Sequence, residues 1–338
     1  MTKLAVVVVL IILFAGCIGW LYNYAALRHY RAVVPPGNFF VVEGRRMHVY
    51  CIGAGSPTIV IESGLGDDWI GWHAVQPGLA RLTRVCSYDR AGLGWSDPDP
   101  GRRDAVAISH LLRELLQRAA ITDRLILIGQ SAGGLYVRRF AAEYPAEIVG
   151  LVLVDSTPPE SFDRLPSNRE TPEQFKTRHR TARLSRIEDA IGLSRLTGRC
   201  EASLPVSLRA YEAYAEAVAC RPEYETSWVG EVDDFETSAK EAENTTFGDL
   251  PLLIISQDPD RPKPGWPAQD IAANPIWAEM QENLKALSTR SHRIIARGSG
   301  HRVQRDRPDV IVSGVGEMIS QLRGTSPLPT EYGTTVTR

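Results

Sequence analysis

The sequence predicts an α/β protein with a doubly wound, mostly parallel sheet of eight strands, a helical insertion and one N-terminal transmembrane helix. Short apolar runs at 58–62, 148–154 and 252–256 have the length and composition of buried strands. Helical patterns separate such runs, most clearly at 104–119, where apolar residues recur every three or four positions. Strands that alternate with helices in this way are parallel and joined by crossovers. The fold class follows from this alternation.

The N-terminal segment is apolar throughout. No charged residue occurs at 4–27, and about 20 apolar residues are enough to cross a bilayer. Three aromatic residues of the kind that mark a membrane interface cluster near its end: Trp20, Tyr22 and Tyr24. We therefore expect 1–27 to be a single-pass membrane anchor and 28–38, which contains Pro35-Pro36-Gly37, to be a linker.

Two other fates of this segment stay open. A cleavable signal peptide would need a shorter apolar region and a small-residue cleavage site. The run Leu13-Phe14-Ala15-Gly16-Cys17 resembles a bacterial lipobox, in which the cysteine is lipidated after cleavage, although the apolar run continues past Cys17. The basic residues on the two flanks, Lys3 against Arg28 and Arg31, differ too little to settle which side of the membrane the domain occupies.

The other elements are assigned in chain order. The remaining strands are expected at 39–42, 45–52, 84–88, 125–128 and 293–296. Between the sixth and seventh strands, 158–249 is polar and helical, and we interpret it as a cap over the carboxyl edge of the sheet, where open α/β sheets bind ligands. The sheet domain then comprises 39–157 and 250–323, and 324–338 is expected to be a flexible tail.

One turn carries a recognisable chemical pattern. The strand at 125–128 breaks at Gly129 and restarts as a helix after Ser131, within Gly129-Gln130-Ser131-Ala132-Gly133. This G-x-S-x-G spacing is typical of a nucleophile elbow, where small residues tolerate a strained backbone that lifts the serine hydroxyl above the sheet. The adjoining helix N-terminus offers free N–H groups to a developing negative charge. A glycine-rich strand–helix turn in a dinucleotide-binding unit would have a similar sequence. This motif alone therefore does not identify Ser131 as a nucleophile, and the other motifs of the chain are needed.

Composition narrows the function classes. A formal net charge of −2 provides no basic surface for nucleic acid. The five cysteines include no C-x-x-C pair, which argues against a zinc site.

Four motifs occur in a characteristic order along 39–322: Glu62-Ser63-Gly64-Leu65-Gly66, Asp89-Arg90-Ala91-Gly92-Leu93-Gly94-Trp95-Ser96, Gly129-Gln130-Ser131-Ala132-Gly133 and Gly300-His301. In this order they resemble the α/β-hydrolase superfamily, specifically its capped esterase- and lipase-like serine hydrolases.

The resemblance implies a role for each matching residue. Ser131 would be the nucleophile and His301 the general base that activates it. The acid that orients the histidine is expected to be Asp258, after the 252–256 strand. Asp260, two residues later, and Asp155, which ends the preceding strand at a position that some family members use, are the alternatives.

The resemblance also implies an oxyanion hole and supporting residues. Its donors would be the backbone N–H groups of Ala132 and Leu65. The loop before Leu65 reads Ser63-Gly64 in place of the family's common His-Gly, but backbone donors do not depend on those side chains. Asp89 and Arg90 are expected to brace loops near the site.

The cysteines beyond the N-terminal segment fall into two groups. The family's strand order would place Cys51 beside Cys86, while Cys200 and Cys220 flank a helix of the insertion. Either pair would form a disulfide only in an oxidising compartment.

The sequence thus predicts a membrane-anchored serine hydrolase that cleaves a carboxylic ester or thioester of a small, apolar substrate through an acyl-enzyme. The resemblance implies no metal and no organic cofactor. A non-catalytic, membrane-tethered hydrolase-fold binding module is the alternative class. A serine-triad relative that acts on amide or C–C bonds is the alternative chemistry. Neither the natural substrate nor the oligomeric state follows from the residues.

Overall fold

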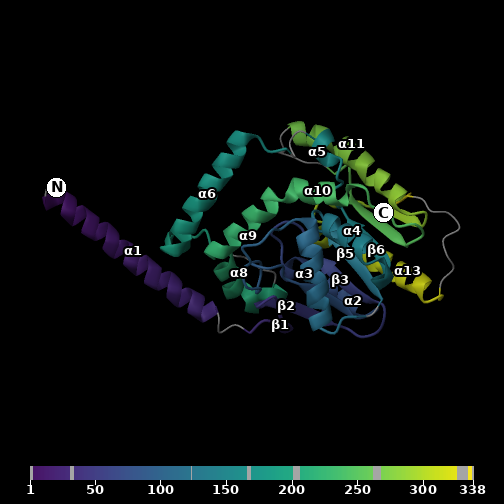
Figure 1. The fold of residues 1–338 in the computed structure, drawn as a ribbon, viewed down its shortest axis with the longest axis horizontal. Helices are drawn as coiled ribbons and strands as arrows, with labels where there is room; N and C mark the ends of the chain where they lie inside the picture. The colour runs from purple at the N-terminus through teal and green to yellow at the C-terminus, as the bar shows by residue number, and fades with distance from the viewer. Residues whose placement is uncertain are drawn as a thin grey trace. The chain divides into compact units, whose positions relative to one another are not determined.

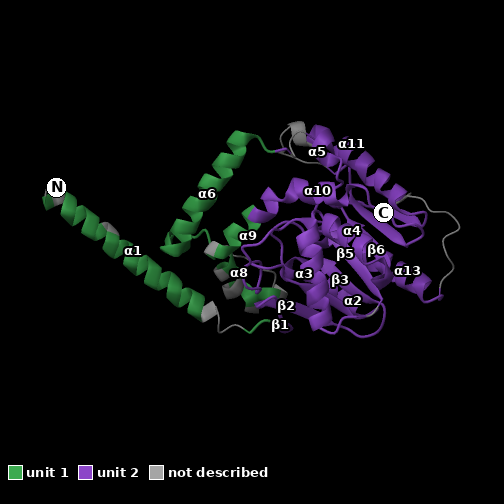
Figure 2. Ribbon diagram, viewed as in Figure 1, with its two compact units in different colours: residues 1–36, 170–229 green, residues 37–169, 230–338 purple. Residues whose placement is uncertain are grey.

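The computed structural model describes residues 3–30, 34–122, 124–165, 169–200, 206–261, 268–325 and 334–336. The chain divides into two compact units (Figure 2). Unit 1 comprises Met1–Pro36 and Glu170–Val229, and unit 2 comprises Gly37–Arg169 and Gly230–Arg338. Residues 31–33 of the expected linker, and 326–333 and 337–338 of the expected tail, lie outside the described residues.

Unit 2 is built on one sheet in the order β1-β2-β4-β3-β5-β6-β7-β8-β9. Its strands are β1 (Asn38–Val42), β2 (Arg45–Ile52), β3 (Thr58–Glu62), β4 (Val85–Tyr88), β5 (Leu125–Gln130), β6 (Ile148–Val154), β7 (Leu252–Gln257), β8 (Ser291–Ala296) and β9 (Thr334–Val336). Among the described strands, the β1–β2 and β2–β4 pairings are antiparallel and the other pairings are parallel. The eight predicted strands and their mostly parallel arrangement are confirmed. The short ninth strand pairs with β8 in a region where we expected only a flexible tail.

Helices cover both faces of this sheet (Figure 1). In β5, Leu125 and Leu127 pack with α3 (Ala105–Arg118) and α4 (Gly133–Glu143). The intervening Ile126 and Ile128 pack with α2 (Gln76–Ala80) and α13 (Pro308–Leu322). Successive side chains of a strand point to opposite faces, so a strand buried on both faces is apolar throughout. Burial of each such side chain stabilises the fold by about 1.5–3 kcal/mol. The strands are therefore held firmly in place, and so are the polar residues that follow their carboxyl ends.

The other described helices of unit 2 lie in its connecting segments. They are α5 (Ser161–Arg164), α10 (Phe235–Glu243), α11 (Ala268–Asn283) and α12 (Val303–Asp306). The described residues of 158–249 form helices and contain no strand, in keeping with the helical insertion predicted there. The ends of that segment, before Glu170 and after Val229, belong to unit 2.

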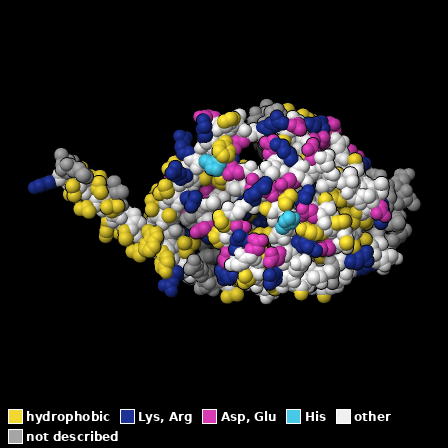
Figure 3. Space-filling model, viewed as in Figure 1, with side chains coloured by type: hydrophobic (Ala, Val, Ile, Leu, Met, Phe, Trp, Pro, Cys, Tyr) yellow, Lys and Arg dark blue, Asp and Glu magenta, His cyan; other side chains and the backbone are white. Residues whose placement is uncertain are grey.

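Unit 1 is helical. It contains α1 (Lys3–Tyr30), α6 (Pro172–Ala190), α7 (Leu193–Leu196), α8 (Glu212–Ala219) and most of α9 (Pro222–Asp233). Within α1, the 24 residues Ala5–Arg28 have a mean hydropathy of 2.6 and are long and apolar enough to cross a membrane. Most of their side chains are exposed, and Figure 3 shows hydrophobic side chains along the surface of this helix.

Candidate active site

Ser131 occupies the turn between β5 and α4. Its φ is 54°, in the left-handed region that non-glycine residues seldom adopt. Backbone hydrogen bonds hold this strained conformation: Ser131 N–H donates to the Val154 carbonyl at 3.2 Å, and its own carbonyl accepts from Thr157 N–H at 3.0 Å. A Cβ on Gly133 would lie 2.5 Å from the Glu62 carbonyl oxygen, so the turn can pack against β3 only with glycine there. The predicted elbow is present in the structure.

His301 follows β8 and faces the serine. Its Nε2 lies 3.0 Å from Ser131 Oγ, and its Nδ1 lies 2.7 Å from Asp155 Oδ2. Gln130, within the elbow itself, donates through Nε2 to the His301 carbonyl at 3.1 Å. Serine, histidine and carboxylate therefore form one continuous hydrogen-bonded chain, in which the imidazole can accept the hydroxyl proton while the carboxylate fixes its tautomer.

Asp155 ends β6 in a left-handed conformation, with φ at 39°, and is fully buried. Besides contacting His301, its Oδ1 accepts hydrogen bonds from Gln257 N–H and Trp277 Nε1–H, both at 3.0 Å. These three contacts fix the orientation of the Asp155 carboxylate and direct Oδ2 at the imidazole.

Asp258, the acid first predicted to orient His301, does not contact the imidazole ring in this structure. Asp258 accepts a hydrogen bond from Gly298 N–H at 2.9 Å and pairs with Arg297 at 2.8 Å. Partial burial opposes ionisation, but these hydrogen bonds and the Arg297 charge hold the pKa of Asp258 below its ordinary value. Asp260 also pairs with Arg297, at 2.6 Å. Both aspartates therefore anchor the turn before His301, and Asp155 is the carboxylate that contacts the ring.

The two predicted oxyanion donors lie on segments that meet at the elbow. A Cβ on Gly64 would lie 3.2 Å from Ser131 Cβ, which shows how closely the loop carrying Leu65 approaches the serine. Within the described part of the chain, neither Leu65 N–H nor Ala132 N–H donates a hydrogen bond to a protein acceptor. Ala132 directly precedes α4, where the helix dipole favours negative charge. Both N–H groups therefore stay candidates for the oxyanion hole.

A buried ionic cluster fixes the shape of that loop. Arg90 donates to the carbonyls of Ser63 and Gly64 at 2.7 and 2.6 Å. Glu231, on α9, pairs with Arg90 at 2.7 Å, and its Oε2 accepts from Gly66 N–H at 2.9 Å. Arg90 thus acts as the loop brace that we expected, whereas Glu231 belongs to no motif and was not foreseen.

Neighbouring acidic residues complete this support. Burial raises the pKa of Glu62, although Arg90 lies 2.6 Å away and opposes the shift. Asp89, also buried, accepts from Trp69 N–H and Trp95 N–H at 2.9 Å each, which confirms it as a brace. The loops around the serine are held by buried charges and hydrogen bonds.

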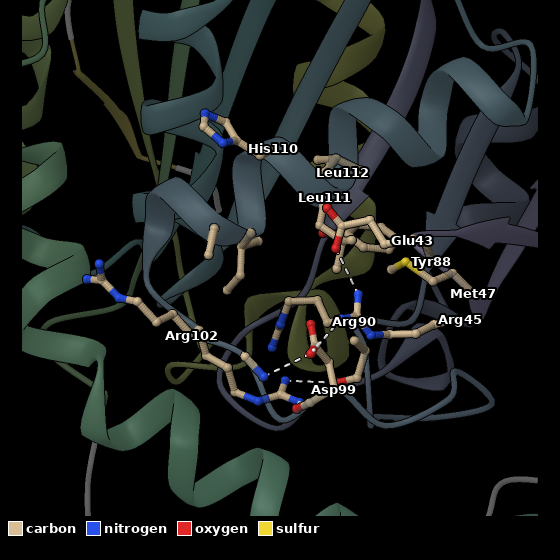
Figure 4. A pocket seen from close by; sticks show the side chains of 15 residues that line it. Glu43, Arg45, Met47, Tyr88, Arg90, Asp99, Arg102, His110, Leu111 and Leu112 are labelled. Carbon is tan, nitrogen blue, oxygen red and sulfur yellow. Dashed lines mark hydrogen bonds and ion pairs between the residues drawn. The ribbon is translucent and has the colours of Figure 1, made fainter.

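A separate polar cavity of about 270 Å³ lies beside α3 (Figure 4). None of the three residues of the hydrogen-bonded chain lines it. Its arginines already face carboxylates: Arg45 pairs with Asp99 at 3.0 Å and with Glu43 at 2.9 Å. Because each of its arginines pairs with a carboxylate, we assign no substrate to this cavity. No group of three or more His, Cys, Asp or Glu side chains that could hold a metal occurs among the described residues.

Two pairs of cysteines are bonded in the structure. Cys51 on β2 is joined to Cys86 on β4, which are register partners in neighbouring strands. Cys200 is joined to Cys220 at the end of α8. The fifth cysteine, Cys17, carries a free, exposed thiol.

Comparison with known proteins agrees with this architecture. An uncharacterized protein of Schizosaccharomyces pombe is 29% identical over 155 residues, which are 37% of this chain and only 29% of that protein. A thermophilic esterase from Thermogutta terrifontis has a TM-score of 0.57 at 19% identity, covering 87% of this chain and all of that one. A membrane phospholipase A, described as a bacterial virulence factor, has a TM-score of 0.55 at 18% identity and covers 96% of this chain and 99% of its own. At such identities the two structures establish the fold alone. The sequence model of the alpha/beta hydrolase family matches residues 59–313, and the chain therefore belongs to this family.

Proposed function

We propose that the protein is a membrane-anchored serine hydrolase that cleaves an ester-like bond through Ser131, His301 and Asp155. The observation that carries the proposal is the unbroken chain of contacts between them, 3.0 Å from Ser131 Oγ to His301 Nε2 and 2.7 Å from His301 Nδ1 to Asp155 Oδ2. A free serine hydroxyl is too weak a nucleophile at neutral pH, and this arrangement supplies the base that it requires.

The chemistry follows from the positions of these atoms. His301 Nε2 accepts the hydroxyl proton as Ser131 Oγ attacks the carbonyl carbon, and Asp155 stabilises the imidazolium that results. The N–H groups of Leu65 and Ala132 stabilise the negative charge on the carbonyl oxygen. The imidazolium then protonates the departing alcohol or thiol, leaving an acyl group on Ser131. Water, deprotonated by His301, attacks the acyl carbon, releases the acid and regenerates the serine.

Ester cleavage is the reaction that best suits this site. The chemistry uses only the chain's own residues, and an esterase and a phospholipase are among the folds to which it is similar. A serine at the elbow argues against haloalkane and epoxide hydrolysis, for which this family uses an aspartate there. Amide and C–C bond cleavage would use the same three residues, so ester specificity must be tested with substrates.

Two features of the chain support membrane attachment. A core helix of α1's length would be buried, but only 6% of its most apolar window is buried. Its 24-residue candidate span exceeds the roughly 20 residues that a bilayer requires. The helix also continues unbroken past Cys17 to Tyr30, which favours a span over a lipidation site at Cys17.

The two disulfides favour an oxidising compartment, so we propose that the hydrolase domain lies on the non-cytosolic side.

Labelling with a fluorophosphonate tests the nucleophile. The natural chain should be labelled, Ser131→Ala should not be, and Ser185→Ala, a serine exchange on α6, should be labelled like the natural chain. Equal labelling of Ser131→Ala and the natural chain would contradict the mechanism. If the folded natural chain is not labelled at all, the protein is better explained as a non-catalytic binding module. Alkaline extraction tests the anchor: the protein should stay in the membrane pellet, and its release would exclude a spanning helix.

A further inference from the structure

A row of large apolar side chains is exposed on unit 1. Leu184 and Ile187 on α6 are each 53% exposed, and Ile191, directly after α6, is 38% exposed. Their spacing of three and four places them on one face of the helix. Leu193 and Leu196, on the following helix α7, are 38% and 66% exposed. We call these five residues the apolar ridge. Contiguous exposed apolar residues mark an interaction surface more often than isolated ones do.

The ridge is joined directly to the candidate membrane span. A Cβ on Gly19 of α1 would lie 2.0 Å from the Ile191 carbonyl oxygen, and a Cβ on Gly192 would lie 2.3 Å from the Gly19 carbonyl oxygen. Gly192 also has φ at 73°, which favours glycine. Helix α1 and the turn between α6 and α7 therefore touch backbone to backbone, which any side chain at either position would prevent.

Asn23 secures the same contact. Its side chain is buried, its Nδ2 donates to the Asp189 carbonyl at 2.7 Å, and its Oδ1 accepts from Arg195 Nε at 3.1 Å. A polar side chain on an otherwise apolar helix is costly to bury without such partners. Both hydrogen-bonding ends of Asn23 are satisfied by the α6–α7 segment, so the contact is specific.

The level of this contact in a bilayer follows from helix geometry. At about 1.5 Å per residue, a hydrocarbon layer of about 30 Å takes up roughly 20 residues. Counted from the start of the apolar run at residue 4, that layer ends near Asn23. Trp20, Tyr22 and Tyr24 are exposed at the same level, as aromatic residues at an interface are. Gly19 and Asn23 thus hold the ridge at the boundary between lipid tails and headgroups.

The charge on α6 suits the same environment. Arg180, Arg183 and Arg186 are exposed on this helix, and Arg180 is four residues before Leu184, on the ridge side. Lys and Arg side chains gather over α6 in Figure 3. In Figure 1, α6 runs across the direction of α1 rather than alongside it, as a helix lying in the membrane plane would. Exposed arginines beside the ridge can pair with the headgroups of anionic phospholipids.

From these contacts we infer that the apolar ridge inserts into the surface of an anionic phospholipid bilayer, giving unit 1 a second membrane contact beside α1. The inference rests on the anchor proposed above. Under this inference, the part of the insertion that belongs to unit 1 is bound to the membrane and is not surrounded by water alone.

Fluorescence quenching on the full-length chain tests the ridge and the anchor separately. An environment-sensitive dye is attached to native Cys17, or, in a Cys17→Ser background, to Ile187→Cys or to the control Ser313→Cys on the exposed surface of α13. The proteins are reconstituted into vesicles of phosphatidylcholine and phosphatidylglycerol with brominated acyl chains. Because interfacial helices bury their apolar face by about 5–10 Å, the dye at 187 should lose about half or more of its emission. The dye at 313 should keep its emission.

Each result then has one meaning. Quenching at 17 and at 187, but not at 313, supports the ridge, and replacing phosphatidylglycerol by phosphatidylcholine should weaken the quenching at 187 only. Quenching at 17 without quenching at 187 overturns the inference and leaves the anchor intact. Equal quenching at 187 and 313 also overturns it, and equal quenching at 187 in both lipids overturns its anionic component. If Cys17 itself is not quenched, the anchor fails and the ridge fails with it.

Discussion

Replacing Asp155 by asparagine should almost abolish turnover. The carboxylate is fully buried and lies 2.7 Å from His301 Nδ1, so the exchange removes a close charge from the imidazolium of the transition state. At 2.7 Å an effective dielectric of about 20 gives an attraction of roughly 6 kcal/mol. The His301 side chain is 42% exposed, so solvent screening reduces this to about 4–5 kcal/mol. Since each 1.36 kcal/mol is a factor of ten, kcat should fall about a thousandfold or more.

The matched control is Asp258→Asn, the same chemical change at the end of the neighbouring strand. Asp258 pairs with the partly exposed Arg297 and does not contact His301, so its loss should cost at most about 1 kcal/mol of stability and leave kcat within a few-fold. Turnover of a p-nitrophenyl ester by purified variants, with circular dichroism to confirm folding, measures both effects. A near-normal kcat in Asp155→Asn together with a large loss in Asp258→Asn would refute the reasoning.

Three further predictions follow from the supporting contacts. Glu231→Gln keeps the size of the side chain but removes the charge that holds Arg90, so kcat should fall roughly tenfold to a hundredfold with little change in KM, in steady-state assays. Burial, reinforced by neighbouring acids, raises the pKa of Asp68 to about 8, so the folded protein binds a proton that the unfolded chain releases. The free energy of unfolding, measured with urea, should therefore fall as pH rises from about 4 to 8, by at most about 1.4 kcal/mol per pH unit, and Asp68→Asn should flatten this dependence. Thiol titration of the denatured chain should find one thiol, Cys17, before reduction and five after it, and finding five before reduction would contradict both disulfides.

The elements that position the site were predictable because their signals are local. The run at 125–128 is apolar on both faces, and Gly129 and Gly133 surround a serine at the one spacing that lets α4 pack against β3. Asp104 was expected to begin a helix, and its side chain accepts from Ala107 N–H at 2.9 Å. Helix caps, glycine turns and apolar strands each have a signal within a few consecutive residues, so these elements can be predicted from the sequence.

The identity of the acid was not predictable in the same way. Asp155 and Asp258 end the adjacent parallel strands β6 and β7, so both carboxylates reach the same edge of the sheet. Which one meets His301 is decided by contacts made far along the chain, Trp277 Nε1–H for Asp155 and Gly298 N–H for Asp258. No local pattern encodes these partners, and the preference for Asp258 came from its position after the 252–256 strand, which the resemblance to the family implied.

The contacts of Glu231 could not be predicted from a local pattern either, and they link the end of the insertion to the loop beside Ser131. It lies near the end of α9, the helix whose last residues return the chain to unit 2, and it makes direct contact with Gly66 and Arg90. A carboxylate that is fully buried is costly unless it is paired, so this contact also stabilises the point at which the chain re-enters the core. The loop that carries Leu65 is therefore hydrogen-bonded to both members of the Arg90–Glu231 ion pair. If the proposed mechanism holds, we expect sequence changes in this return helix to alter turnover without any contact with Ser131.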